Sequence, residues 1–384
     1  MRIFEKREVN LQTIALSTFS LYFGFTVWSV MFNNFAKEVF NITPAQLGII
    51  QSVRELPGLL GFMVGTMALY MAEVKIATLS IAISGLGLIL MGYANSIWAL
   101  GVGTFVMSVG FHNFVSSNDA LLLHHVKTKE SAKAQGKIRS TESAAGVIAT
   151  ACVFVATLWL GYRQVLPLFG AIVFLTGIYL SFTLKSNRGE GEERKVCFKR
   201  EYALYYLLSF LRGCRRHIFS TFAIFLLVAN HHLNITAVSV LFFVSSLVTT
   251  YTYRAMGHVV EKWGERTVLA GSSFILMFIF SGYAFIPWLP LLIVFYVIDN
   301  VLFGSSIALD SYMRKIAHKA DLTNCISFSQ TANHISAVII PVVGGVIWEI
   351  FGYQSTFLLG AAIVLIDALF SLRVKSTAPD YKYN

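Results

Sequence analysis

Charged residues are scarce in this chain. Asp, Glu, Lys and Arg together make up 13% of its 384 residues, whereas hydrophobic residues make up 56%. The mean hydropathy is correspondingly positive, at +0.66. So much apolar surface cannot be buried in a single water-soluble core. The composition therefore excludes a soluble globular protein and predicts an integral membrane protein.

Cysteine is also rare, and several common motifs are missing. The four cysteines (Cys152, Cys197, Cys214 and Cys325) show no C-x-x-C or zinc-ligand spacing, so neither a structural disulfide nor a metal site is expected. We expect no removable signal peptide, because the first ten residues, MRIFEKREVN, are polar and carry no short apolar core followed by a small-residue cleavage site. The chain has no GxxxxGK[ST] run and no dinucleotide-binding glycine pattern. We therefore expect no cofactor, no ATP hydrolysis and no enzyme activity.

Long apolar runs are what the chain has in abundance. Each is about 20 to 28 residues long, enough for an α-helix to cross a hydrocarbon core of roughly 30 Å. Helices satisfy their own backbone hydrogen bonds within the bilayer, so spanning helices are expected. We predict twelve of them, at residues 10–36, 45–71, 75–93, 97–125, 137–160, 164–184, 202–230, 236–260, 267–286, 289–312, 323–350 and 354–373.

Basic residues are unevenly distributed over the predicted loops. Nearly all of them fall on the side that carries both termini, whereas the opposite side has only Lys37 and Arg163. Short cytoplasmic loops retain Lys and Arg, so both termini are predicted to be cytoplasmic. The net charge of +10 follows from this topology and requires no nucleic-acid partner. The short loops favour the cytoplasmic membrane of a bacterium or an archaeon.

The chain repeats itself around a polar break. The break runs from Lys185 to Arg200 and is predicted to be a cytoplasmic linker. It separates a six-helix bundle at residues 1–184 from a second at residues 201–384. The matches are Asn41-Ile42-Thr43 with Asn234-Ile235-Thr236, Gly92-Tyr93 with Gly282-Tyr283, Asp119 with Asp310, and LGYRQVLPLFGAIVFLTG with FGYQSTFLLGAAIVLIDA. These matches indicate a six-span unit duplicated in parallel orientation.

One motif carries a family resemblance. In GHVVEKWGER, from Gly257 to Arg266, an acidic residue follows a glycine by four positions, and a basic residue, a glycine and another basic residue come after it. In the first half only Gly65 of this motif is kept, with Leu69 at the acidic position. With twelve spans and a duplication, the chain resembles the major facilitator superfamily over essentially its whole length. The resemblance implies an all-α integral membrane fold, with twelve transmembrane helices in two pseudo-symmetric six-helix bundles, and a monomeric secondary transporter working by alternating access.

The resemblance also implies a cytoplasmic gate. In such a gate the acid of the motif caps a helix end and pairs with a basic residue, which latches the halves in one state. The residues assigned to it are Gly257, Glu261, Arg266, Asp310 and Arg314 in the second half, and Asp119 and Arg139 in the first.

Three arginines interrupt the seventh span, in the stretch LRGCRRHIF from Leu211 to Phe219. Arg212 follows Glu201 by about 16 Å of helix, which places the cluster near mid-membrane. At 100° per residue, Arg212, Arg215 and Arg216 share one broad face. Each would cost on the order of 2.5–3.5 kcal/mol against lipid, so they must face a wet cavity or paired acids. Arg54, in the second span, is a fourth cation at depth.

Acidic residues can neutralise only part of this charge. Glu55 and Asp299 are expected near the arginines, and Glu142 is expected to pair with Arg139 three residues earlier. Asp367 falls in the twelfth span, which the resemblance places at the periphery. The remaining positive charge favours a site for an anionic substrate, and purely structural pairing is the alternative.

The predicted anion site consists of arginines and other polar residues at similar depth. Guanidinium groups suit carboxylate or phosphate because their planar fork donates two parallel hydrogen bonds. The predicted substrate-binding residues are Arg54, Arg212, Arg215, Arg216, His112, Asn113, Asn300, Asn333 and His334. The histidines and asparagines among them can instead serve as interhelical hydrogen-bond partners. Glu55 and Asp299 are the predicted carriers of a coupling proton.

The sequence thus predicts a secondary transporter for a small anionic solute, coupled to protons or to another ion. One alternative is a proton-driven exporter of drugs or other amphiphiles. Many such exporters in the family carry a Gly-Pro-rich fifth span, whereas the fifth span of this chain has no proline. A non-transporting membrane sensor that uses the same fold is the other alternative.

Overall fold

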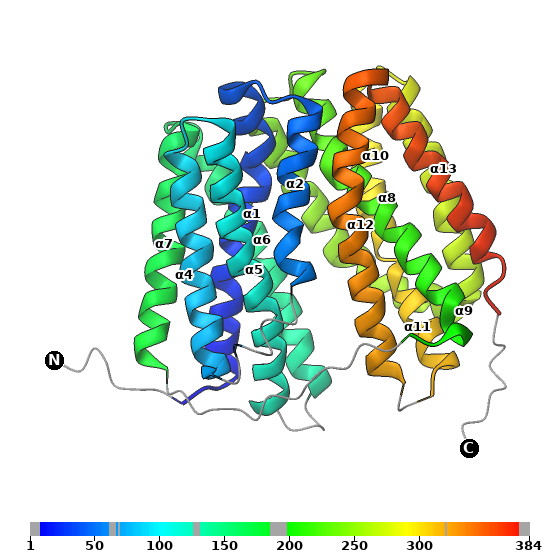
Figure 1. Cartoon of the computed structure of the whole chain (residues 1–384), viewed down its shortest axis with the longest axis horizontal. Helices are drawn as coiled ribbons and strands as arrows, with labels where there is room; N and C mark the ends of the chain where they lie inside the picture. Colours follow the sequence, from blue (N-terminus) through cyan, green and yellow to red (C-terminus); the bar gives the residue numbers. More distant parts are fainter. Residues whose placement is uncertain are drawn as a thin grey trace. The chain divides into compact units, whose positions relative to one another are not determined.

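The structure is a computed structural model that describes residues 8–60, 67, 70–125, 131–184, 198–318 and 321–375. Its regular secondary structure is helical (Figure 1). Most of the predicted linker lies outside the described residues, as do Gly65 and Leu69 of the first-half motif. The helices are α1 (Leu11–Phe40), α2 (Pro44–Leu59), α4 (Glu73–Gly92), α5 (Ile97–His125), α6 (Ser131–Ala156), α7 (Tyr162–Thr183), η2 (Arg200–Tyr202), α8 (Ala203–Ala229), α9 (Ile235–Phe285), α10 (Leu289–Phe303), α11 (Ser306–Ile316), α12 (Leu322–Phe351) and α13 (Tyr353–Ser371).

These helices account for the twelve predicted spans. Among the described residues, 10 helical segments are long and apolar enough to cross a membrane. Of these, α9 supplies Ile235–Tyr253 and Ala255–Phe285, and α10 with α11 supplies Leu289–Ile316. The two predicted spans outside this set are α2 and α8, the helices that carry Arg54 and the arginine cluster. The all-α membrane fold predicted from the sequence is confirmed.

The chain forms two compact units. Unit 1 consists of Met1–Ile42, Val53–Glu193 and Leu233–Phe243. Unit 2 consists of Thr43–Ser52, Arg194–His232 and Val244–Asn384. The first turns of α2 therefore belong to unit 2, and the first turns of α9 belong to unit 1.

The starts of α2 and α9 fix the register of the repeat. The Thr43 hydroxyl accepts a hydrogen bond from the N–H of Gln46 at 3.3 Å, and the Asn234 side chain accepts one from the N–H of Ala237 at 2.9 Å. Two residues before each cap the backbone is left-handed, with φ 47° at Asn41 and φ 54° at His232. Residue 41 therefore corresponds to residue 232, so the two Asn-Ile-Thr tripeptides are out of register by two positions.

Glycines allow three helices of unit 1 to pack closely. A Cβ on Gly85 of α4 would lie 2.3 Å from the backbone nitrogen of Phe174 and 2.6 Å from the carbonyl oxygen of Gly170, both in α7. On another side of α4, a Cβ on Gly87 would lie 2.3 Å from the nitrogen of Met107 in α5. Small residues of this kind let transmembrane helices approach until their backbones touch.

We expect Gly85→Ala to destabilise the protein by about 1–3 kcal/mol, because the added methyl group must push α4 away from α7. The measurement is the melting temperature in detergent. Gly146→Ala in α6 is the matched control, since its Cβ would lie 3.7 Å from the nearest atom, Thr26 Oγ1, which is ordinary contact. Equal melting temperatures for the two variants would contradict the proposed role of Gly85.

Two irregularities shape unit 2. Within α9 the chain turns at Gly264, whose φ of 77° favours glycine, and this turn joins the eighth span to the ninth. The tenth span is interrupted at Gly304 and Ser305, between α10 and α11. At this break the N–H of Gly304 donates to the carbonyl of Val301 at 3.0 Å, in place of the regular bond to Asn300. The Tyr253 hydroxyl donates to the Asn300 carbonyl at 3.0 Å and satisfies it.

Candidate functional site: an arginine cluster at a helix break

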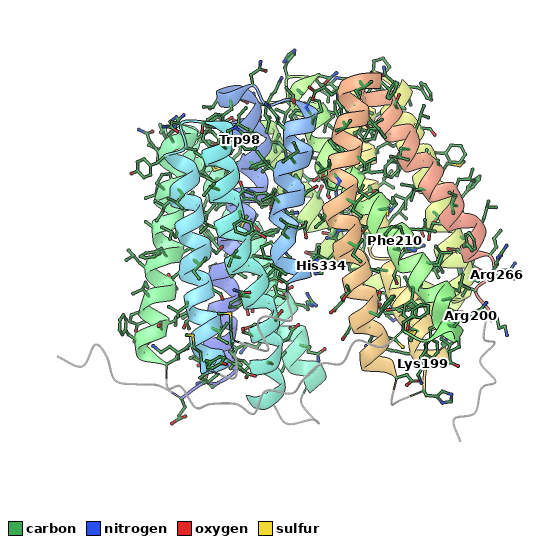
Figure 2. The ribbon with its side chains drawn as sticks, viewed as in Figure 1. Trp98, Lys199, Arg200, Phe210, Arg266 and His334 are labelled. Atoms are coloured by element: carbon green, nitrogen blue, oxygen red, sulfur yellow. The ribbon has the colours of Figure 1, made fainter. Side chains whose placement is uncertain are left out.

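Helix α8 is enclosed by protein over most of its length. It packs against α12 and α13, as Figure 1 also shows. Between Leu211 and Val228, the exposed side chains are those of Arg216 and Ser220, one turn apart on the same face, and Arg212 is half-buried. Figure 2 shows Phe210 well along the helix from Lys199 and Arg200, which lie just before its start. The open face of α8 is thus a narrow polar stripe, unlike the broad apolar face of a helix in contact with lipid.

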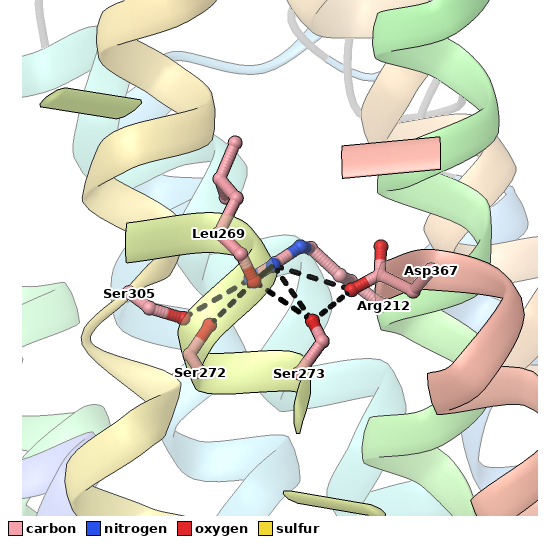
Figure 3. Close-up of polar contacts among 6 residues, drawn as sticks. All are labelled: Arg212, Leu269, Ser272, Ser273, Ser305 and Asp367. Carbon is pink, nitrogen blue, oxygen red and sulfur yellow. Dashed lines mark hydrogen bonds and ion pairs between the residues drawn. The ribbon is translucent and has the colours of Figure 1, made fainter. Parts of the chain in front are cut away.

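Arg212 lies in a buried polar network that involves three other segments of unit 2 (Figure 3). Its guanidinium is 3.2 Å from Asp367 of α13, and it donates to the Ser305 hydroxyl at 3.0 Å and the Leu269 carbonyl at 3.1 Å. The Ser273 hydroxyl also donates to Asp367. The sequence assigned the twelfth span to the periphery and did not count Asp367 among the acids expected near the arginines. The structure pairs it with Arg212, because α13 packs against α8.

Arg215 also has an acidic partner. Its Nη1 atom is 2.5 Å from Asp299 Oδ1 of α10, and the two side chains are only 7% and 9% exposed. In a low-dielectric interior the two groups compensate each other's charge, which offsets part of the cost of burying them. The predicted proximity of Asp299 to the cluster is confirmed.

Arg216 has a different environment. The carbon Cζ of its guanidinium lies 3.8 Å from the centroid of the Phe303 ring, a cation–π contact, and the side chain is exposed. Phe303 is the last residue of α10, beside the break. The three arginines therefore contact one short segment of the tenth span, at Asp299, Phe303 and Ser305.

A second charged cluster lies in unit 1. Arg54 of α2 is paired with its neighbour Glu55, and its Cζ lies 4.9 Å from the ring centroid of Trp28 in α1. The Nε2 atom of His112 in α5 is 3.7 Å from the other carboxylate oxygen of Glu55. Glu55 thus lies between Arg54, which is always charged, and His112, which is a cation only when protonated. The Phe25 and Phe111 rings stack nearby, with centroids 4.3 Å apart.

The remaining predicted binding residues lie on three helices. Asn113 is half-buried on α5, and Asn333 and His334 are half-buried on α12, where Figure 2 marks His334. Asn333 lies against Gly213, since a Cβ on that glycine would come within 2.6 Å of Asn333 Oδ1. The side chain of Asn300 donates to the carbonyl of Tyr296 at 2.8 Å.

In the second-half motif the buried acid is Glu265, which the sequence did not single out. Glu265 is 2% exposed, and it pairs with Lys315 at 2.6 Å and accepts a hydrogen bond from the Ser311 hydroxyl at 2.7 Å. The predicted gate residues of this half are distributed differently: Glu261, Arg266, Asp310 and Arg314 are exposed, and the Cβ position of Gly257 faces open space. The turn at Gly264 directs Glu265 inward, so the structure brings together Glu265 and Lys315 rather than Glu261 and Arg266.

In unit 1 the predicted gate residues lie close to one another. Arg139 Nη1 is 3.0 Å from Glu142 Oε2, which confirms that predicted pair. The Tyr22 side chain of α1 interacts electrostatically with Glu142. Asp119 is exposed on α5 and interacts electrostatically with Arg139 and Glu142.

The aromatic partners of the arginines had no signal in the sequence. Trp28 and Phe303 are two among many aromatic residues, which make up 14% of the chain. Glu265 belonged to the motif but not to its acidic position. Only the rotation of each helix about its axis distinguishes these residues from their neighbours, and that rotation depends on packing between segments far apart in the sequence.

A salt bridge fixes the start of α8 outside the apolar spans. Lys199 donates to Asp321 at 2.6 Å, and the Tyr202 hydroxyl is 3.2 Å from the same carboxylate oxygen. The hydrogen bond from Lys199 lowers the pKa of Asp321 below its ordinary 3.8.

A carboxyl group whose pKa is lowered by folding stabilises the protein above its unfolded pKa and loses that effect as the pH falls through the folded value. We therefore expect wild type to melt above Asp321→Asn at pH 7 and the two melting temperatures to converge below about pH 4. Lys199→Met should behave like Asp321→Asn. A difference between wild type and Asp321→Asn that was as large at pH 3 as at pH 7 would contradict an ionic origin.

The sequence model of the Major Facilitator Superfamily matches residues 14–212 and, a second time, residues 203–383. The chain belongs to the Major Facilitator Superfamily. The double match agrees with the predicted duplication. No curated protein sequence matches the chain significantly.

Solved structures of the superfamily share the fold of this member. A bacterial homolog of the human lysosomal transporter Spinster, in an inward-facing and unoccupied conformation, superposes with a TM-score of 0.77 at 15% identity, covering 96% of this chain and 98% of that one. The nucleoside transporter NupG superposes with a TM-score of 0.77 at 13% identity, covering 98% of this chain and 100% of that one. At such identities the likeness shows the fold alone. This superfamily member is thus a multi-pass membrane protein of a transporter family.

Proposed function

We propose that the protein is a secondary transporter for a small anionic solute, with Arg216 as the main anion-binding residue of unit 2. The observation that carries the proposal is the exposure of Arg216 on a helix that is buried over most of its length. A guanidinium facing lipid would cost several kcal/mol, so the open stripe of α8 must be wet. Charged residues at such depth mark a substrate pathway more often than they stabilise a fold.

Arg212 and Arg215 have a supporting role in this proposal. Both are held by buried acids, Asp367 and Asp299. They add positive potential behind Arg216 and fix the segment that carries Phe303. In unit 1, Arg54 is the second anion-binding candidate, with His112 and Asn113 on the neighbouring α5 as further polar contacts. Asn300, Asn333 and His334 are the polar candidates of unit 2.

Protons are the proposed coupling ion. Glu55 interacts with both Arg54 and His112, so a proton gained by His112 or by Glu55 changes how strongly Arg54 is held. Asp299 has the same relation to Arg215. A solute carboxylate or phosphate near these arginines would alter the proton affinity of both acids, which is the requirement for coupling.

The remaining features of the proposal follow from the family and the loop charges. The protein is proposed to act as a monomer in the cytoplasmic membrane of a bacterium or an archaeon, with both termini in the cytoplasm. It moves its solute by alternating access and catalyses no covalent chemistry. The exposed Asp119, Arg139, Glu261, Arg266, Asp310 and Arg314 are proposed to form the cytoplasmic gate.

An exporter of amphiphiles is the second candidate, and one observation favours it. The stacked rings of Phe25 and Phe111 and the Trp28 ring lie near Glu55 in unit 1, and aromatic rings beside an acid suit a lipophilic cation.

The deciding experiment is a melting-temperature screen of the detergent-purified protein at pH 5.5 and pH 7.5. The panel holds organic acids, inorganic phosphate, chloride, lipophilic cations and neutral drugs. A ligand at 100 times its Kd stabilises the folded state by about 2.7 kcal/mol, whatever the direction of transport. Stabilisation by anions supports the proposal. Stabilisation by lipophilic cations alone would contradict it and support the exporter.

A further inference from the structure

The contacts of the buried Asp367 carboxyl group in α13 involve only one of its two oxygens. Its Oδ2 atom lies 3.2 Å from the Arg212 guanidinium and accepts a hydrogen bond from the Ser273 hydroxyl. In Figure 3 every dashed line to Asp367 ends on this oxygen. The other oxygen, Oδ1, is buried and accepts no hydrogen bond from the part of the chain that the structure describes. An ionised oxygen in such a place lacks the donors that stabilise its charge, and a proton on it would remove that charge.

The guanidinium of Arg212 has three hydrogen-bond acceptors besides Asp367. It donates to the Ser305 hydroxyl at 3.0 Å, to the Leu269 carbonyl at 3.1 Å and to the Ser273 hydroxyl at 3.3 Å. These acceptors are uncharged, so they still accept hydrogen bonds from Arg212 when Asp367 gains a proton. The proton changes the charge of the network instead, because an ionised Asp367 neutralises Arg212 and a protonated one does not.

The groups around this pair come from the neighbouring helices. Arg215 interacts electrostatically with Arg212 and is itself paired with Asp299 of α10. From α9, the group that contacts Asp367 is the uncharged Ser273. With Asp299 and Asp367 both ionised, the two ion pairs carry no net charge, and a proton on Asp367 leaves one positive charge. Helix α12 also packs against α13, and its titratable side chains are those of Cys325, His334 and Glu349.

We propose that Asp367 is a proton-binding residue of the transporter and that its proton binds together with the anionic solute. The inference rests on the proposed function and adds to it a proton site on the twelfth span. Arg212 lies one turn before Arg216 on the same face of α8 and is half-buried there. A positive charge left on Arg212 is therefore close to the proposed anion site, where a bound anion compensates it. Proton and anion then raise each other's affinity.

Each of the two binds weakly without the other. With Asp367 ionised, Arg212 is neutralised and attracts the solute less. With Asp367 protonated and no solute bound, the charge of Arg212 is largely buried without a counter-charge, which costs free energy. Binding of both together avoids these two states, and coupled movement of a proton and a solute requires this kind of cooperativity.

The first test counts the protons taken up when an anion binds to the full-length protein in detergent. The probes are acetate, benzoate, inorganic phosphate and chloride. The probe that stabilises wild type most is titrated between pH 5.5 and pH 7.5, in dilute buffer with a pH indicator. Wild type should take up more protons per bound anion than Asp367→Asn, by up to about one. Protons exchanged by the anion itself cancel in this difference.

Two serine variants provide a second test, in which Asp367 is kept. Ser273→Ala removes a donor that stabilises the ionised carboxylate, so the pH at which the anion affinity falls should rise by roughly one unit. Ser272→Ala is the matched control. The Ser272 hydroxyl donates to the Leu269 carbonyl at 3.0 Å, as that of Ser273 does at 2.9 Å, but Figure 3 draws no contact between Ser272 and Asp367. These variants decide the question even if Asp367→Asn does not fold.

The outcomes separate this inference from the proposed function. Equal proton uptake by wild type and Asp367→Asn at every pH would overturn the inference alone. An equal pH dependence of the anion affinity in Ser273→Ala and Ser272→Ala would do the same. A wild type stabilised by none of the four anions would overturn the proposed function and the inference with it.

Discussion

Replacing Arg216 by alanine is expected to lower the affinity for the anion by about 10- to 100-fold and to leave the melting temperature of the ligand-free protein nearly unchanged. Charge-assisted hydrogen bonds contribute about 1.5–3 kcal/mol each, and the guanidinium can donate two of them to one anion. Arg216 is exposed, and Asp299 keeps its ion pair with Arg215 when Arg216 is removed.

The measurement for Arg216→Ala is a melting-temperature titration with the anion that stabilises wild type most. Ser220→Ala is the matched control, since Ser220 is exposed on the same stripe but carries no charge. A loss of stability in ligand-free Arg216→Ala as large as its loss of binding would mean that the residue is structural.

Replacing Arg212 by alanine is expected to have the opposite pattern, with a loss of about 3–5 kcal/mol in stability. The change leaves the buried Asp367 carboxyl group without its ion-pair partner, and its side chain is only 4% exposed. Asp367→Ala should be as harmful, because it leaves the guanidinium without its counter-charge. Both variants should melt well below wild type with or without an anion.

A double variant tests the cause of that loss. Arg212→Met combined with Asp367→Leu removes both charges and keeps most of the apolar volume, so it should recover most of the lost stability. If the double variant loses as much as the two single changes added together, the ion pair is not what stabilises this region.

The two predictions assign different roles to the arginines of one short stretch of sequence. In LRGCRRHIF, Arg212 and Arg215 compensate buried acids, whereas Arg216 lies on the open stripe. The helical spacing of 100° per residue predicted that all three arginines share one broad face of a helix, and the structure agrees. It could not separate them, because the difference depends on which neighbouring helix meets each edge of that face.

The fold itself was largely predictable. Spans of apolar residues are set by the thickness of the bilayer, and this constraint acts locally along the chain. The missing information was the rotation of helices in contact. Arg212 and Asp367 are far apart in the sequence, and only the packing of α8 against α13 brings them together. The same limit explains the motif after the eighth span, where the turn at Gly264 buries Glu265 instead of Glu261.

The repeat shows a different limit. Identical letters suggested that Asn41 corresponds to Asn234, but the structure aligns Asn41 with His232 through their left-handed backbones. The helix caps then fall on Thr43 and Asn234, two different residue types that perform the same task. In this repeat the backbone conformation and the helix cap are retained at positions where the residue type differs.

The break in the tenth span has a mechanical consequence. In an unbroken helix the backbone hydrogen bonds form a continuous ladder, which makes every turn equally resistant to bending. At Gly304 and Ser305 that ladder is interrupted, and the segment from Asp299 to Ser305 is held from outside by Arg215, Tyr253 and Arg212. Each of these contacts is made by a single side chain on another helix. The angle between α10 and α11 is therefore fixed by side-chain contacts in place of backbone hydrogen bonds, and Arg212 and Arg215 of the cluster make two of them.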